Sequence, residues 1–189
     1  MQLKKLIAIA TVLAALGASE AKGRQPHSGY RGFIDWSNDL RSDTFYGFPR
    51  QTSFYTGVTT SHGYQINSMF FAGAGIGAEH CSNLDNWIVP VFAEGRADFS
   101  FGVFTPFADI RLGANMAEGV GVYFSPSVGY RFNWGRKAGV NLALGMTLGG
   151  YKCEIYNIVI NDSGYTSLMY VGSERRARPY FSFRVGFDF

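Results

Sequence analysis

From Ser28 onward, hydrophobic and polar residues alternate along the chain with a period of two. Residues 181–189 show the pattern most clearly, because every odd position there is Phe or Val and every even position is polar or Gly. The same alternation recurs at residues 122–132 and 140–149. A period of two is typical of β-strands whose two faces meet different environments. The pattern therefore predicts an all-β chain.

Segments with this alternation define eight predicted strands. Their ranges are 29–37, 51–66, 69–80, 87–99, 104–114, 120–132, 138–152 and 177–189. The connections after the second, fourth and sixth strands are short, whereas those after the first and the seventh, residues 38–50 and 154–176, are long. Short turns at one end and longer loops at the other are typical of an outer-membrane barrel with both termini in the periplasm. We therefore predict a closed eight-stranded antiparallel transmembrane up-and-down β-barrel.

The last long connection is rich in apolar and aromatic residues, including Tyr156, Ile158 and Tyr170. We predict that it forms a hairpin that extends the seventh and eighth strands beyond the membrane, with Asn161-Asp162-Ser163-Gly164 as its turn. An alternative interpretation of the same residues is an exposed surface for an extracellular partner.

Alternation alone does not decide whether the apolar face points into a core, as in a soluble barrel, or outward to lipid. The polar face carries five arginines and six carboxylates, a near balance that favours pairing inside a narrow lumen. These predicted lumenal residues are Arg31, Asp35, Glu79, Glu94, Arg96, Asp98, Asp109, Arg111, Arg131, Arg184 and Asp188. Seven glycines on the same face also suit a crowded interior, namely Gly73, Gly75, Gly77, Gly113, Gly129, Gly145 and Gly186.

Aromatic residues gather at the predicted strand ends. Tyr64, Tyr130 and Phe132 lie at the periplasmic ends, and Trp36 and Trp87 lie near the opposite ends. Aromatic residues are enriched at both membrane–water interfaces, so two aromatic girdles indicate a chain that spans a membrane.

The first and last strands of such a barrel must pair, because an open strand edge in hydrocarbon leaves backbone groups unsatisfied. Side chains alone can fill an eight-stranded barrel, so the charge network predicts a plugged lumen, with a proton or small-ion path as the alternative.

Composition agrees with this interpretation. Only 16% of residues are charged, 16% are aromatic and 24 are Gly, while 47% are hydrophobic, which argues against general disorder, a coiled coil and a collagen-like chain. The formal net charge of +3 is too small to indicate a nucleic-acid partner.

The N-terminal segment predicts export. Lys4 and Lys5 precede an eleven-residue apolar run, 6–16, that ends in small residues. This run is shorter than the about 20 residues that a transmembrane helix needs, so residues 1–21 are interpreted as a signal peptide. Residues 22–189 then form a single outer-membrane β-barrel domain.

The chain resembles the family of small eight-stranded, porin-like outer-membrane proteins. The segments that carry the resemblance are the signal, residues 60–64 (TSHGY), 107–111 (FADIR), 123–129 (YFSPSVG) and 183–189 (FRVGFDF). The resemblance implies a monomer in the bacterial outer membrane, in contact with lipid and lipopolysaccharide. It also implies that the outer-membrane assembly machinery recognises the C-terminal strand, through Val185, Phe187 and Phe189.

Few residues offer chemistry for other sites. Cys81 and Cys153 form a candidate disulfide in an oxidising compartment, although their strands are predicted on opposite walls, so the pairing stays open.

The neighbours Ser61 and His62 point to opposite strand faces and lack an acidic partner, which argues against a hydrolase. His80, beside Glu79 and Cys81, lacks the ligand spacing of a zinc site. We predict no catalytic residue, no metal and no cofactor.

The functional hypothesis is a non-enzymatic outer-membrane barrel that contributes to envelope structure or to surface interaction through its external loops. The alternatives are a narrow porin-like channel for ions or small solutes and, less favoured, a lipid-modifying barrel enzyme.

Overall fold

The computed structural model describes residues 28–43, 51–81, 86–99, 103–116, 120–134, 138–160 and 166–189. The predicted signal peptide lies outside these residues. The strands are β1 (Gly29–Asp43), β2 (Gln51–Gln65), β3 (Phe70–Cys81), β4 (Asn86–Ile88), β5 (Pro90–Asp98), β6 (Phe104–Asn115), β7 (Gly121–Trp134), β8 (Ala138–Ile160) and β9 (Thr166–Asp188). Among the described residues, no helix is long and apolar enough to cross a membrane.

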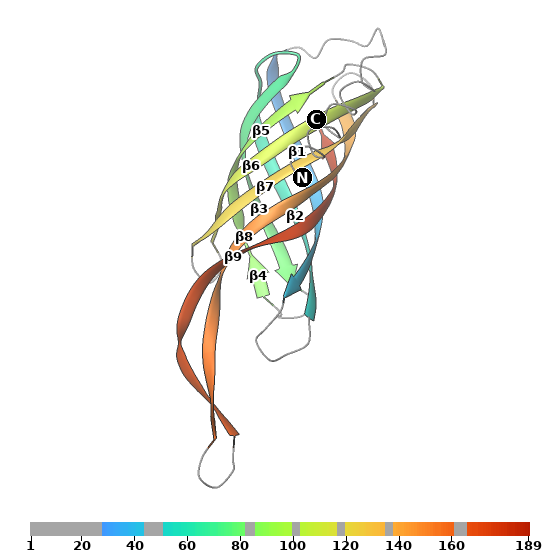
Figure 1. Ribbon diagram of the computed structural model, residues 1–189. Coiled ribbons are helices and arrows are strands. Elements are labelled where there is room, and N and C mark those ends of the chain that lie inside the picture. Colours follow the sequence, from blue (N-terminus) through green and yellow to red (C-terminus); the bar gives the residue numbers. More distant parts are fainter. Residues whose placement is uncertain are drawn as a thin grey trace, which may run out of the picture.

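All strands belong to one antiparallel sheet that closes on itself (Figure 1). β1 pairs with β2 on one side and with β9 on the other, where Phe33 lies opposite Asp188 and Leu40 lies opposite Phe181. The additional pairing of β2 with β3 completes the circle. The predicted closure between the first and last strands is therefore confirmed, and so is the all-β barrel class.

β4 and β5 are two pieces of one barrel strand. Both pair with β3 in the same register, since Glu79 lies opposite Ile88 in β4 and Ile76 lies opposite Val91 in β5. Pro90 begins β5 and has no N–H group to donate, so the ladder of hydrogen bonds is interrupted there. With β4 and β5 counted together, the described part of the chain forms a barrel of eight strands, as predicted.

The two ends of the barrel differ. One end, called here the turn end, carries Gly29, the C-terminal Phe189 and the short connections β2–β3, β5–β6 and β7–β8. At the other end, called the hairpin end, β8 and β9 continue as a two-stranded ribbon beyond the other strands (Figure 1). The predicted extension of the last two strands is thus confirmed, while its proposed turn, 161–164, lies outside the described residues.

Three strand boundaries were predicted too short. β1 continues to Asp43 instead of residue 37, β8 continues to Ile160 instead of 152, and β9 begins at Thr166 instead of 177. The physical reason is that these extensions pass beyond the region where one face is apolar and the other polar. Backbone pairing with a neighbouring strand continues there without the period-two signal.

The outer surface of the barrel is an apolar belt. Large hydrophobic side chains are exposed on every barrel strand, for example Leu112, which is 59% exposed, and Leu144, which is 50% exposed. Aromatic side chains are exposed toward both ends: Tyr30, Tyr64, Phe104, Phe132 and Phe189 at the turn end, and Trp36 and Trp87 toward the hairpin end. The exterior is therefore apolar, with aromatic residues at two levels.

Candidate functional site: the charged lumen

The structure places the predicted charged residues inside the barrel. Ten of the eleven are buried, and the side chain of the eleventh, Arg131, is 13% exposed. The buried ten are Arg31, Asp35, Glu79, Glu94, Arg96, Asp98, Asp109, Arg111, Arg184 and Asp188. A seventh lumenal carboxylate, Asp39, was missed because it lies in a segment that the sequence assigned to a loop. Five arginines therefore face seven carboxylates among the described residues.

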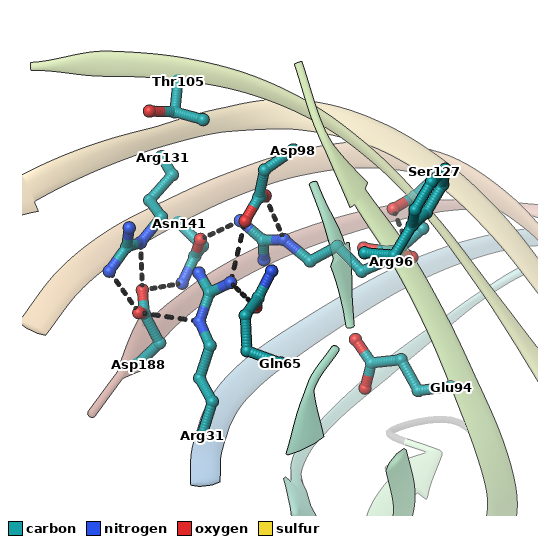
Figure 2. Close-up of polar contacts among 12 residues, drawn as sticks. Arg31, Gln65, Glu94, Arg96, Asp98, Thr105, Ser127, Arg131, Asn141 and Asp188 are labelled. Carbon is teal, nitrogen blue, oxygen red and sulfur yellow. Dashed lines mark hydrogen bonds and ion pairs between the residues drawn. The ribbon is translucent and has the colours of Figure 1, made fainter. Parts of the chain in front are cut away.

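A closed ring of polar contacts fills the turn end of the lumen (Figure 2). Arg31 Nη1 lies 2.8 Å from Asp98 Oδ2, and Asp98 Oδ1 lies 2.8 Å from Arg96 Nε. Arg96 Nη2 donates to Asn141 Oδ1 at 2.8 Å, and Asn141 Nδ2 donates to Asp188 Oδ1 at 2.9 Å. Asp188 Oδ2 then returns to Arg31 Nε at 3.2 Å. The ring, called here the turn-end cluster, joins β1, β5, β8 and β9.

Two further side chains attach to this ring. Arg131 of β7 makes a two-pronged contact with Asp188, through Nε at 2.8 Å and Nη2 at 2.6 Å. Gln65 of β2 accepts a hydrogen bond from Arg31 Nη1 at 2.8 Å and donates to the backbone oxygen of Asn67 at 2.8 Å. Charge-assisted and two-pronged hydrogen bonds are the strong ones, so the cluster ties six barrel strands together at one level.

A second set of ion pairs lies in the middle of the lumen. Arg111 of β6 pairs with Asp35, contacts Glu94 with its Nε 3.4 Å from Oε2, and donates to Thr59 Oγ1 at 3.1 Å. Arg184 of β9 lies 2.6 Å from Asp109 Oδ1. Arg184 also donates to Ser127, whose hydroxyl donates to Asp109 at 2.9 Å. The contacts of Arg111 with Asp35 and of Arg184 with Asp109 cross the lumen between strands that are not neighbours in the sheet.

The hairpin end of the lumen lacks such pairing. Asp39 and Glu79 are each 2% exposed, and within the described residues neither forms an ion pair with an arginine. Ser37 Oγ lies 3.4 Å from Glu79 Oε1, and Ser182 hydrogen-bonds to Asp39. Asp39 Oδ1 and Glu79 Oε2 have no hydrogen-bond partner in the described structure. We call Ser37, Asp39, Glu79 and Ser182 the hairpin-end cluster.

The shape of this cluster depends on Gly57. Glu79 lies opposite Gly57 across the β2–β3 pair, and Gly57 lies opposite Ser37 across the β1–β2 pair. A Cβ at position 57 would come within 2.6 Å of both Cα and Cγ of Glu79. Because glycine leaves this space free, the Glu79 side chain reaches over β2 to Ser37. All seven glycines predicted for the lumenal face have similarly little room for a Cβ.

Aromatic rings pack against the arginines inside the lumen. Arg96 stacks on Phe107 with its Cζ 3.5 Å from the ring centroid, and Arg31 lies 4.7 Å from the centroid of Phe33. Arg111 lies 4.8 Å from the centroid of Phe92. At the hairpin end, the rings of Tyr55 and Tyr180 stack 6.2 Å apart. Aromatic residues were predicted at the strand ends, and the structure shows a further set inside the lumen.

Together these groups leave little space inside the barrel. From the turn end to the hairpin end, Asp98, Arg96, Glu94, Arg111 and Glu79 are each at most 4% exposed. A water-filled path along the lumen would expose such side chains to the solvent. The described side chains thus form a plug that is polar and held by ion pairs across the barrel.

The other candidate residues lie outside this network. Ser61 is buried in the lumen, whereas His62 is exposed on the outer face, where it hydrogen-bonds to Tyr30 at 2.6 Å and to Thr60 at 3.0 Å. The two residues therefore face opposite sides of β2, as the alternation predicts. No group of three or more His, Cys, Asp or Glu side chains that could hold a metal ion occurs in the described part of the chain.

The two cysteines lie on strands that are far apart in the sheet. Cys81 ends β3, Cys153 lies in β8, and three barrel strands separate β3 from β8 on either side of the circle. Their side chains lie outside the described part of the structure, so the disulfide stays a prediction.

The residues of the predicted assembly signal are on the lipid-facing side of β9. Phe187 and Phe189 are 42% and 40% exposed, and their rings stack 6.4 Å apart. Val185 is half-buried on the same face. The arrangement presents a short aromatic stripe at the C-terminus of the barrel, and its recognition by assembly machinery stays a prediction.

Comparison with known proteins supports the fold. The structure of Neisserial surface protein A (NspA) aligns with a TM-score of 0.57 and 10% sequence identity, covering 86% of this chain and 97% of NspA. This chain has the fold of the small eight-stranded outer-membrane β-barrels. KdgM porin aligns with 16% identity over 83% of this chain and 98% of its own, at a TM-score of 0.30 that is too low to inform the comparison. No protein-family model and no curated protein sequence matches the chain.

Proposed function

We propose that the protein is an integral outer-membrane β-barrel without enzymatic activity, in which a plugged lumen makes a rigid scaffold and the β8–β9 ribbon provides a contact surface outside the cell. In this proposal residues 1–21 direct export and are removed. The turn end faces the periplasm, which is typical of membrane barrels with short turns at one end.

The observation that carries the proposal is the reversed distribution of charge and hydrophobicity. Ten charged side chains of the predicted network are buried inside, while leucine, isoleucine, valine and phenylalanine side chains cover the outside. In water the exterior would be unfavourable, because large apolar patches would be exposed to solvent. In a bilayer the exterior is matched to hydrocarbon, and closure satisfies the backbone.

The surface role rests on the backbone of the ribbon. β7 pairs with β8 no further than Gly149, and β1 pairs with β9 only from Phe181 onward. Within the described residues, 150–160 and 166–177 therefore pair only with each other. The outer backbone edges of such a ribbon offer N–H and C=O groups to an added strand, a common mode of peptide recognition.

Membrane fractionation tests the location. The mature protein is expected in the outer-membrane fraction, with a mobility on gels that changes when the sample is boiled, as expected for a barrel that stays folded in detergent. Recovery in the soluble periplasmic fraction would overturn the proposal.

Planar-bilayer recordings test the plugged lumen. We expect no large steady conductance, because the central side chains are buried and paired. Stable channel openings in the unaltered protein would favour the narrow-channel alternative instead. Mass spectrometry of lipopolysaccharide from cells with and without the protein tests the enzymatic alternative, and identical lipid profiles are expected.

A further inference from the structure

The outer wall of the barrel contains a groove toward the hairpin end. It lies over β1 to β4, has a volume of about 500 Å³, and is lined by Trp36, Thr56, Val58, Ala78, His80 and Trp87 together with Gly57. This volume falls in the range of sites for small molecules, about 300 to 1,000 Å³. None of these residues contributes an ion pair to the lumenal network, so the groove is a separate feature of the molecule.

The groove exists because large walls flank a floor of small and medium-sized residues. Trp36 and Trp87 are 54% and 57% exposed, whereas the floor between them consists of Gly57, Val58 and Ala78. The first wall is fixed, because Trp36 Nε1 donates a hydrogen bond to Thr56 Oγ1 at 2.9 Å. At the second wall, the rings of Trp87 and His80 lie 5.0 Å apart. The groove is therefore a built feature, with at least one wall held by a hydrogen bond.

The polarity of the groove changes along its length. Val58 and Ala78 are opposite each other on β2 and β3, and each strand then places its polar lining residue, Thr56 or His80, two positions nearer the hairpin end. An occupant with a hydrocarbon part toward the middle of the belt and a polar part toward the hairpin end fits this gradient. The apolar floor is continuous with the lipid-facing surface of the barrel, so a membrane lipid reaches it directly.

We propose that this groove binds an acyl chain of lipid A, the membrane anchor of lipopolysaccharide, with the polar end of the lipid beside Thr56 and His80. The inference rests on the proposed orientation, in which the hairpin end lies in the outer leaflet, where lipid A resides. In this proposal the two tryptophans flank the acyl chain, and their amphipathic indole rings contact both the hydrocarbon and the lipid headgroups.

Native mass spectrometry of the detergent-purified barrel with added lipid A tests the site. In Ala78→Leu the added side chain occupies the floor of the groove, and we expect the retained lipid A to fall about fivefold or more, since the excluded methylene groups of the acyl chain lose their burial. The matched control is Ala93→Leu, because Ala93 is also exposed on the outer face but lies in β5 outside the groove. This control is expected to retain lipid A as the unaltered protein does.

The outcomes separate this inference from the proposed function. All variants are first required to fractionate with the outer membrane and to show heat-modifiable mobility, so a failure of the barrel itself is recognised at that step. Equal retention of lipid A by Ala78→Leu and the unaltered protein overturns the site. Equal retention of phosphatidylethanolamine and lipid A by the unaltered protein overturns the choice of lipid. A dimer that Ala78→Leu abolishes assigns the groove to a second copy and also overturns the inference.

Discussion

The buried carboxylates at the two ends of the lumen have different hydrogen-bonding and ion-pair partners. In the turn-end cluster each carboxylate has arginine partners, and amide side chains from Gln65 and Asn141 complete the contacts. In the hairpin-end cluster Asp39 and Glu79 have only serine hydroxyls as described partners. A buried charge that is paired and hydrogen-bonded is tolerated, whereas an unpaired one is costly. The comparison indicates that stability is concentrated at the turn end.

The largest effect is expected at the turn end. Asp98→Asn removes the charge that two arginines share, Arg31 at 2.8 Å and Arg96 at 2.8 Å, and leaves both guanidinium groups underpaired. We expect the free energy of unfolding to fall by about 3 kcal/mol, as for other broken buried pairs. Urea unfolding of the barrel in detergent micelles, followed by the gel mobility shift, measures the loss. An unchanged urea midpoint would show that the cluster contributes nothing to stability.

A smaller loss is expected from crowding the hairpin end. Gly57→Ala forces a Cβ against Glu79, and we expect a loss of about 2 kcal/mol from the overpacked contact. Gly95→Ala is the matched control, since the nearest atom to its added Cβ, Ile110 Cγ2, is 3.6 Å away. The control is expected to be neutral or to stabilise by about 0.5 kcal/mol, because alanine suits a strand better than glycine. Equal losses in both variants would contradict the close approach at Gly57.

Replacing a buried carboxyl group at the hairpin end is expected to stabilise the barrel, whereas the two substitutions above are expected to destabilise it. Glu79→Gln keeps the size of the side chain and replaces a buried carboxyl group, which has no arginine partner among the described residues, with a group that cannot ionise. We expect the free energy of unfolding to rise by about 1 kcal/mol. The same urea titration measures it. A loss similar to that of Asp98→Asn would mean that the two ends do not differ, and the comparison would fail.

The smallest effect is expected outside the barrel. Replacing residues 156–172 with Asn-Gly leaves Ile155, Asn and Gly as a three-residue turn between Glu154 and Ser173, which are already paired. We expect no measurable change in barrel stability or gel mobility, because the described residues of the removed segment pair only within the ribbon. Failure of the shortened protein to reach the outer membrane would instead make the ribbon part of the assembly pathway.

The sequence predicted the barrel and the lumenal face, and physical reasons explain what it missed. A lipid-facing strand must be apolar at every second position. This alternation identifies the eight strands in the sequence and assigns their arginines and carboxylates to the lumenal face. Asp39 was missed because Ser37 to Asp43 is polar on nearly both faces, which hides the outer half of β1. The specific pairs, such as Arg184 with Asp109, were not predictable, because contacts across the lumen depend on strand stagger that alternation does not encode.

The position of Asp188 at the end of the last strand has a consequence for the order of assembly. Arg31 and Arg131 both contact this residue, and Asp109 contacts Arg184 of the same strand. Until β9 arrives, three charged side chains contributed by β1, β6 and β7 lack these partners. Insertion of the final strand therefore closes the backbone and neutralises the interior in one event. A chain truncated before β9 would lose the seam of the barrel and the counter-charges of its lumen together.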